Sequence, residues 1–408
     1  MIHYFDNCAT TRADDEVVEI LQRYHTEQYF NPSARSSESL KIANDIAKAR
    51  EQIARLLGAE SNEVYFTSGG TESNNIAILG AIKSKHGNVV VSAAEHSAVF
   101  DTVSQLESKG YEVRISKVLP DGHIDAEDFV SKIDGETLLA CFMHVNNETG
   151  AINDVKGLNQ AVKNINPKTV TVCDGVQAVG KIPVNFADLG VDCYTLSGHK
   201  FHASKGIGAL IIKNGTRVSP IVRGGGQEKG LRSGTEYVGG IISLACAISK
   251  AVEKLQENSA NYLYYKTLIR TALADVDGWK ENCVENCSPA IMSLAFETIK
   301  GEVLLHMLEE FEIVVGTGSA CSSKNKQSRV AKAIGLPKEY TEGILRISFS
   351  KYNTIDEVQL LADKLRECVL NLRKTMLLLS ITVNYSTNCR FIKYYYRHNT
   401  VFMEKSRE

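Results

Sequence analysis

Short apolar runs alternate with helical repeats between about residues 60 and 215. Val89–Ser92, Leu138–Val145 and Thr169–Asp174 have the length and composition of buried strands. Lys156–Ile165, which lies between two of them, has the apolar spacing of a helix. Strands that alternate with helices predict a mostly parallel sheet with helices on both of its faces.

Polar residues follow several of these apolar runs. Gly70 and Thr71 begin a predicted helix after one strand, His96 and Asn147 follow two others, and Asp174 ends a fourth. Because ligands gather at the carboxyl ends of parallel strands, these residues are candidates for a binding site. Each also has an ordinary explanation when taken alone, such as a capped strand–helix turn or a structural histidine.

A lysine lies in a tight polar turn between two apolar runs, residues 192–196 and 208–213. Ser197, His199 and Lys200 occupy this turn. A lysine between buried strands is costly unless its charge is paired or removed, and a Schiff base with pyridoxal phosphate (PLP) removes it. Ser197 and His199 offer hydrogen bonds to a phosphate. The alternative for Lys200 is a solvated loop lysine, which a short motif alone does not exclude.

The rest of the chain predicts a second domain, as a length of 408 residues also favours. A long helix over 238–256 leads into it, and an amphipathic helix covers 355–372. The loop 316–324 is rich in small residues and carries Cys321, which favours a mobile, exposed thiol over a packed one. Arg346 lies inside a predicted strand, where it either forms a salt bridge or binds a substrate carboxylate.

Composition excludes several classes of function. A net charge of −2 offers no electrostatic attraction to nucleic acid or to a membrane surface, and the apolar run 376–383 is too short to span a bilayer. Ten cysteines without a disulfide-like pattern suit a reducing compartment, so we expect a cytoplasmic protein without a signal peptide. Cys283 and Cys287 form a single Cys-x3-Cys pair with no second pair, and we expect no metal site.

Taken together, the motifs resemble those of cysteine desulfurases of the nitrogen-fixation and iron–sulfur assembly type. The resemblance extends from Tyr4 to about Leu372. The matching stretches are Thr67–Asn75, Glu95–His96, Asn146–Gly150, Asp174–Lys181, Ser197–Lys200, Arg232–Thr235, Gly318–Cys321 and Leu345–Arg346.

This resemblance implies the fold of type I PLP-dependent transferases. It is an α/β fold in which a large domain has a mostly parallel sheet between helices, and a smaller α+β domain packs beside it. We expect the large, PLP-binding domain at residues 15–256. The small domain would comprise 1–14 and 257–374 and carry the cysteine loop, and the tail 375–408, which is unlike the family, has no assigned role.

The activity implied is the conversion of L-cysteine to L-alanine, with the sulfur left on the enzyme as a persulfide. Lys200 would form the Schiff base and move the α-proton, Cys321 would attack the substrate sulfur, and His96 would stack on the ring and donate a proton. Asn147 and Arg346 would hold the substrate carboxylate. The residues expected to bind PLP are Gly70, Thr71, His96, Asp174, Gln177, Ser197, His199, Lys200 and Thr235.

The family also implies a homodimer in which Thr235 approaches the phosphate of the partner's site. The sulfur acceptor stays open between an iron–sulfur scaffold, a thiolation protein and cofactor biosynthesis. Cys8 and Ser204 stand where the family usually has alanine and proline. Three alternatives remain: an aminotransferase, a selenocysteine lyase, or a sulfur-relay scaffold without turnover. The first two would keep Lys200 and Asp174.

Overall fold

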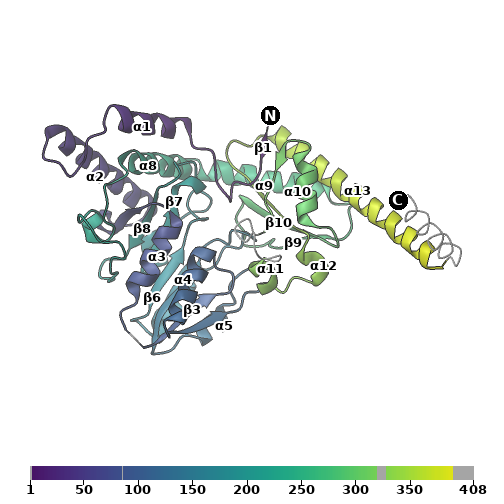
Figure 1. Ribbon diagram of the computed structural model, residues 1–408, viewed down its shortest axis with the longest axis horizontal. Coiled ribbons are helices and arrows are strands. Elements are labelled where there is room, and N and C mark those ends of the chain that lie inside the picture. Colours follow the sequence, from purple (N-terminus) through teal and green to yellow (C-terminus); the bar gives the residue numbers. More distant parts are fainter. Residues whose placement is uncertain (1, 85, 319–327, 389–408) are drawn as a thin grey trace, which may run out of the picture.

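The computed structural model describes residues 2–84, 86–318 and 328–388, with side chains as far as residue 376. Helices and strands gather around one large sheet and, beside it, two small ones (Figure 1). No helix in these described ranges is long and apolar enough to cross a bilayer. Cys321 lies outside the described residues.

The large sheet has seven strands in the order β2-β8-β7-β6-β5-β3-β4. Only β8 runs opposite to the others, since it pairs antiparallel with both of its neighbours while the remaining pairs are parallel. The prediction of a mostly parallel sheet is therefore confirmed. The strands are β2 (Val64–Thr67), β3 (Asn88–Ser92), β4 (Glu112–Ser116), β5 (Thr137–Met143), β6 (Val170–Asp174), β7 (Cys193–Ser197) and β8 (Gly208–Ile212).

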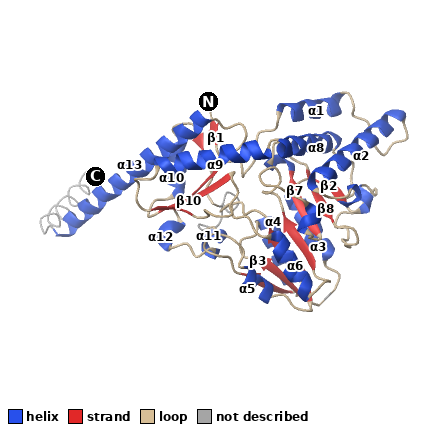
Figure 2. Cartoon of the chain, turned by 180° about the vertical axis from the view of Figure 1, so that it is seen from behind, coloured by secondary structure: helices blue, strands red, loops and turns tan. Residues whose placement is uncertain are grey.

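Successive residues of the central strands enter two different apolar clusters, one on each face of the sheet. In β5, Leu139 and Cys141 belong to one cluster and Ala140 and Phe142 to the other. This alternation is what a strand buried on both faces requires. Helices supply the covering layers, with α3 and α4 on one face and α2, α6 and α8 on the other (Figure 2). The helices of this part are α1 (Asp15–Thr26), α2 (Ser37–Leu57), α3 (Gly70–Ala81), α4 (Ser97–Ser108), α5 (Ala126–Ser131), α6 (Val155–Ile165), α7 (Phe186–Leu189) and α8 (Val238–Glu253).

A separate apolar cluster forms the core of the smaller part, and it contains Phe5 from the start of the chain. Strand β1 pairs with β11, and β10 lies between β12 and β9. Residues 3–5 therefore contact the small part, whereas the N–H groups of Thr11 and Asp14 donate to the His199 and His202 carbonyls of the large part. The elements are β1 (His3–Tyr4), β9 (Trp279–Glu281), β10 (Ile291–Phe296), β11 (Ile313–Val314), β12 (Ile344–Ser348), α9 (Leu255–Ala272), α10 (Gly301–Glu309), α11 (Arg329–Ala333), α12 (Lys338–Thr341) and α13 (Ile355–Asn388).

Two predicted helices differ from those observed. The helix expected over 238–256 is two helices, because the backbone leaves helical geometry at Lys254, where neither glycine nor proline marks a break. The helix expected over 355–372 continues to Asn388 and runs outward from the small part (Figure 1). Helix α2 ends at Leu57, and the Gly58 that follows it adopts a left-handed φ of 67°, as is common for glycine after a helix.

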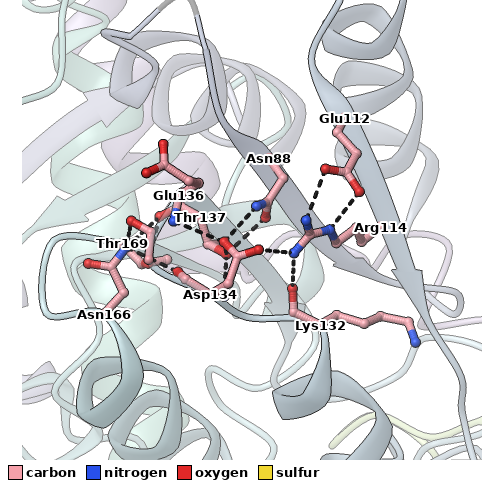
Figure 3. Close-up of polar contacts among 10 residues, drawn as sticks. Asn88, Glu112, Arg114, Lys132, Asp134, Glu136, Thr137, Asn166 and Thr169 are labelled. Carbon is pink, nitrogen blue, oxygen red and sulfur yellow. Dashed lines mark hydrogen bonds and ion pairs between the residues drawn. The ribbon is translucent and has the colours of Figure 1, made fainter.

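The amino ends of β3, β4 and β5 are joined by a polar network (Figure 3). Arg114 binds both Glu112 at 2.8 Å and Asp134 at 2.6 Å, and Asp134 also accepts from the Asn88 amide at 2.9 Å. The hydrogen bonds from Arg114 lower the pKa of Asp134 to about 2. Thr137 donates to Asn88, also at this edge. The carboxylates here are paired and bonded, so we assign this edge a structural role.

Candidate active site

The opposite edge of the sheet collects the predicted site residues. Strands β2, β3, β5, β6 and β7 are parallel to one another, so their carboxyl ends share this edge. The strand order places β7 next to β6, and β6 next to β5. Asp174 ends β6, and Gly70, His96, Asn147 and Lys200 follow the other four strands.

Asp174 is the last residue of β6 and is only 5% exposed. Its carboxylate accepts a hydrogen bond from the Asn74 side-chain amide at 2.9 Å and one from the Val176 backbone N–H at 3.0 Å. The carbonyl oxygen of Asn74 in turn accepts from the Thr195 hydroxyl on β7. These bonds fix the orientation of a buried carboxylate at the strand end, where it can pair with a cationic ring nitrogen.

Lys200 follows β7 at the end of a short 3-10 turn. Its Nζ donates to the carbonyl oxygens of Cys8 and Ala9 at 2.6 Å and 2.8 Å. The lysine is therefore held by backbone of the N-terminal segment. These two bonds fix the amine at the carboxyl end of β7, on the strand next to the one that ends in Asp174.

His96 and Glu95 follow β3. His96 caps α4, since its Nδ1 accepts from the Ala98 N–H at 3.1 Å, and burial lowers its pKa. Both Asp174 and Lys200 are close enough to act electrostatically on this imidazole. Glu95 is fully buried, and burial followed by repulsion from Asp174 raises its pKa to about 8. The Glu95 carboxyl is therefore mainly protonated at pH 7.

The start of α3 has the properties of an anion site. No side chain caps this helix, and Gly69 before it has a φ of 151°, which favours glycine. A Cβ on Gly69 would lie 3.4 Å from the Ser197 hydroxyl oxygen, so Ser197 adjoins this turn. Thr71 is exposed in the first turn of α3.

Two expected cofactor ligands have protein partners in this chain. His199 Nδ1 lies 3.0 Å from the Thr10 hydroxyl, and burial followed by the charge of Lys200 lowers its pKa to about 4, so the imidazole is neutral at pH 7. Gln177 donates its amide to the carbonyl of Cys8 at 3.0 Å, and its oxygen accepts from Lys181. Gln177 therefore lies against the same N-terminal segment that binds Lys200.

Arg346 enters the site from β12 of the small sheet and is 3% exposed. One terminal nitrogen binds Asp6 at 2.7 Å and the other donates to the carbonyl of Asn147 at 2.9 Å. Its Nε has no hydrogen-bond partner among the described residues. A buried guanidinium with an unused donor fits a carboxylate ligand, because an unsatisfied buried donor is costly.

Both ends of the undescribed stretch 319–327 lie at Glu148. Ser328 donates to Glu148 Oε2 at 2.5 Å, and a Cβ on Gly318 would lie 3.0 Å from the same oxygen. Gly316, two residues earlier, exchanges backbone hydrogen bonds with Arg346. The described residues on both sides of this stretch therefore lie near the Arg346 guanidinium.

Comparison with known families agrees with this geometry. Residues 3–361 match the model of the aminotransferase class-V family. The chain belongs to this family. A cysteine desulfurase of Trichormus azollae is 37% identical over 379 residues, which cover 91% of this chain and 93% of that protein. The resemblance to cysteine desulfurases is thus confirmed.

Solved structures of this class-V aminotransferase family have the same fold. A structure titled "NifS-like protein" superposes with a TM-score of 0.86 at 34% identity, covering 91% of this chain and all of that one. A structure of SspA in complex with cysteine gives a TM-score of 0.76 at 31% identity, covering 86% of this chain and 99% of that one. The predicted fold class is confirmed.

Enzymes of this class-V family depend on PLP, and the residues of this chain fit that cofactor. The site offers a lysine amine, a fixed buried carboxylate on the adjacent strand and an uncapped helix start. These are the groups that a PLP aldehyde, its pyridine nitrogen and its phosphate each require.

Three residues that shape this site were not predicted: Asn74, Asp6 and Glu148. Asn74 is a polar residue on the buried stripe of α3, four positions before Ile78, and that break in the pattern was a usable signal. Asp6 and Glu148 approach Arg346 from distant parts of the chain. No local pattern marks such long-range pairs.

Proposed function

We propose that this chain is a PLP-dependent cysteine desulfurase that converts L-cysteine to L-alanine and retains the sulfur on Cys321. The proposal rests on the arrangement of three residues. Lys200 and Asp174 lie at the ends of adjacent strands, and the Arg346 guanidinium has one N–H without a partner among the described residues. Relatives named cysteine desulfurase, and a neighbour whose title names a complex with cysteine, support this substrate.

The chain's own residues define how substrate and cofactor are held. Arg346 binds the carboxylate of L-cysteine with its Nε, while Asp6 and the Asn147 carbonyl orient the guanidinium. Asp174 holds the ring nitrogen, and the start of α3, with Ser197, holds the phosphate. When bound, PLP supplies the electron sink that stabilises negative charge at the substrate α-carbon.

Proton and sulfur transfer fall to Lys200, Cys321 and His96. Lys200 Nζ takes the α-proton, which its position beside uncharged carbonyls allows. The Cys321 thiolate attacks the substrate sulfur, so an S–S bond forms and the C–S bond breaks, leaving its electron pair on the substrate. His96, whose pKa is lowered by burial, delivers the proton that completes alanine.

Product analysis tests this proposal. With L-cysteine and a dithiol reductant, we expect alanine and sulfide in equal amounts. Selenide from selenocysteine at a far higher kcat/KM than sulfide from cysteine would make the chain a selenocysteine lyase. A keto acid product would make it an aminotransferase. A colourless protein without bound cofactor and without turnover would instead favour the sulfur-relay scaffold.

Arg346→Ala is expected to raise the KM for cysteine about 10- to 150-fold, because charge-assisted hydrogen bonds contribute roughly 1.5–3 kcal/mol. Cofactor content should stay normal, which separates lost substrate binding from misfolding. Steady-state kinetics with L-cysteine measure the change.

The matched control is Arg270→Ala. Arg270 also pairs with a carboxylate, that of Glu281 at 2.8 Å, within the small part of the chain. Its removal should leave the KM unchanged. If the KM of Arg346→Ala is also unchanged, Arg346 does not bind the substrate, and its role is limited to the salt bridge with Asp6.

We also propose a homodimer with composite sites. Thr235 is exposed and forms no hydrogen bond with the other described residues, and the nearby Ile221 and Val222 are 41% and 44% exposed. Exposed apolar side chains beside a predicted ligand of the cofactor favour an interface at this segment.

Mixing two inactive variants tests whether Thr235 acts across the dimer. Lys200→Ala lacks the lysine, and Thr235→Asp places a negative charge near the phosphate. If Thr235 serves the partner's site, subunit exchange creates one intact site in each mixed dimer, and about a quarter of wild-type activity returns. If Thr235 serves its own subunit, or the protein is a monomer, the mixture stays inactive.

We further propose that the persulfide passes to a cysteine of an acceptor protein in the reducing cytoplasm, such as an iron–sulfur scaffold or a thiolation enzyme. The eight cysteines that the structure describes are all free of disulfides, which supports that compartment. Loading the enzyme with cysteine and then capturing bound proteins would identify the acceptor.

A further inference from the structure

A pair of thiols lies in the small part of the chain, at a surface turn after β9. Cys283 and Cys287 lie four positions apart on this turn, and each thiol shifts the pKa of the other. Cys283 is buried and Cys287 is partly exposed, so solvent reaches one member of the pair. Both also contact backbone of the turn between them, at the carbonyls of Glu285 and Val284.

A buried ammonium group completes this cluster. Lys266 of α9 is 0% exposed, and its Nζ lies 3.4 Å from Cys287 Sγ and 2.9 Å from the carbonyl oxygen of Ser288. The hydrogen bond from Cys283 and then the charge of Lys266 lower the pKa of Cys287 to about 6. A buried cation beside a partly exposed sulfur is the environment that favours a thiolate.

We propose that Cys287 and Cys283 form a redox-active dithiol, in which Cys287 reacts with hydroperoxides and Cys283 closes the disulfide. The desulfurase reaction needs neither cysteine, and the described residues hold no cluster suited to a metal ion that would compete for them. The pair therefore constitutes a second reactive site on the chain.

The chemistry balances with the hydroperoxide as the oxidant. The Cys287 thiolate attacks one peroxide oxygen, so an S–O bond forms, the O–O bond breaks and hydroxide, or alkoxide, leaves. Sulfur loses two electrons and becomes a sulfenic acid. Cys283 then gives up its proton and attacks that sulfur, so the S–S bond forms and hydroxide leaves. In total, two thiols and one peroxide give one disulfide and two molecules of water, or one of water and one of alcohol.

The turn connects this pair to the active site. Cys287 forms a β-bridge with Ala151, and the Ser288 N–H donates to the carbonyl of Gly150 at 2.7 Å. Ala151 and Gly150 end the turn that carries Asn147, whose carbonyl accepts from Arg346. Closing the disulfide moves Cys287 Sγ relative to Lys266, so we expect the oxidised enzyme to have a higher KM for cysteine, reversed by dithiol.

Mass spectrometry of one tryptic peptide tests the disulfide. Cleavage after Lys280 and Lys300 gives a peptide with Cys283 and Cys287 as its only cysteines. After mild peroxide and blocking of free thiols, this peptide should be two hydrogens lighter than the reduced form. It should regain two alkylation sites after dithiol. Oxidation of Cys287 to sulfinic acid without a disulfide, or no reaction, would overturn the proposal.

The pH dependence of alkylation tests the role of Lys266. Labelling of Cys287 in the full-length wild type should reach half its plateau below pH 7, whereas Cys246, whose pKa burial raises to about 11, should still accelerate above pH 8. Lys266→Met should slow Cys287 labelling at pH 6 roughly 2- to 20-fold, after allowing for the greater nucleophilicity of a more basic thiolate. If that variant does not fold, the wild-type profile decides, since equal profiles for the two cysteines contradict the proposal.

Discussion

Replacing Cys321 by alanine is expected to abolish sulfide release and alanine formation together. The substrate C–S bond breaks only when a thiolate takes the sulfur, and no other side chain of the loop 316–324 can accept it as a persulfide. The residues proposed to hold the cofactor, and the contacts of Arg346 that set the KM, lie outside residues 319–327. The variant should therefore keep its cofactor content and its affinity for cysteine. Assays of both products, with absorption of the bound cofactor, measure the effect.

Two substitutions sharpen this test. Cys321→Ser keeps the size of the side chain but not the sulfur nucleophile, and it should be as inactive as Cys321→Ala. Cys246→Ser, at a partly exposed cysteine of α8, should retain wild-type turnover. Continued production of alanine from cysteine by Cys321→Ala would show that another group receives the sulfur.

Lys200→Ala should lose covalent attachment of the cofactor and reduce turnover by at least about 10⁴-fold, because one amine serves as both the attachment point and the base. In the structure this amine is held by the Cys8 and Ala9 carbonyls. Borohydride reduction followed by mass spectrometry should find PLP on Lys200 in the wild type and on no lysine of the variant.

Lys213→Ala is the matched control for Lys200→Ala. Lys213 follows β8, which pairs with the strand that leads into Lys200, but its side chain is exposed. Its variant should retain attachment and turnover. Cofactor linked to a different lysine in Lys200→Ala would place the attachment point elsewhere.

The sheet edge at which the site residues lie could be predicted from the sequence because of a general property of parallel sheets. Apolar runs revealed the strands, and the carboxyl ends of parallel strands meet on one side. This property predicts that His96, Asp174 and Lys200 lie near one another. The observed strand order brings the strands of Asp174 and Lys200 into direct contact, which the sequence alone does not specify.

Contacts between distant segments could not be predicted in the same way. Asp6 and Arg346 are 340 positions apart in the sequence, and they share no local motif. The sequence predicts that Cys283 and Cys287 bind no metal, but it does not show which charged residue lies beside them. That residue, Lys266, belongs to helix α9. The break at Lys254 could not be predicted either, because no helix-breaking residue stands there.

The measurement that tests the account most directly is the location of sulfur after a brief reaction with L-cysteine. The tryptic peptide between Lys300 and Lys324 contains Cys321 as its only cysteine. After alkylation, we predict one extra sulfur on this peptide and an equal amount of alanine in solution. Extra sulfur on the Cys283–Cys287 peptide instead, or alanine without any sulfur bound to the protein, would contradict the account.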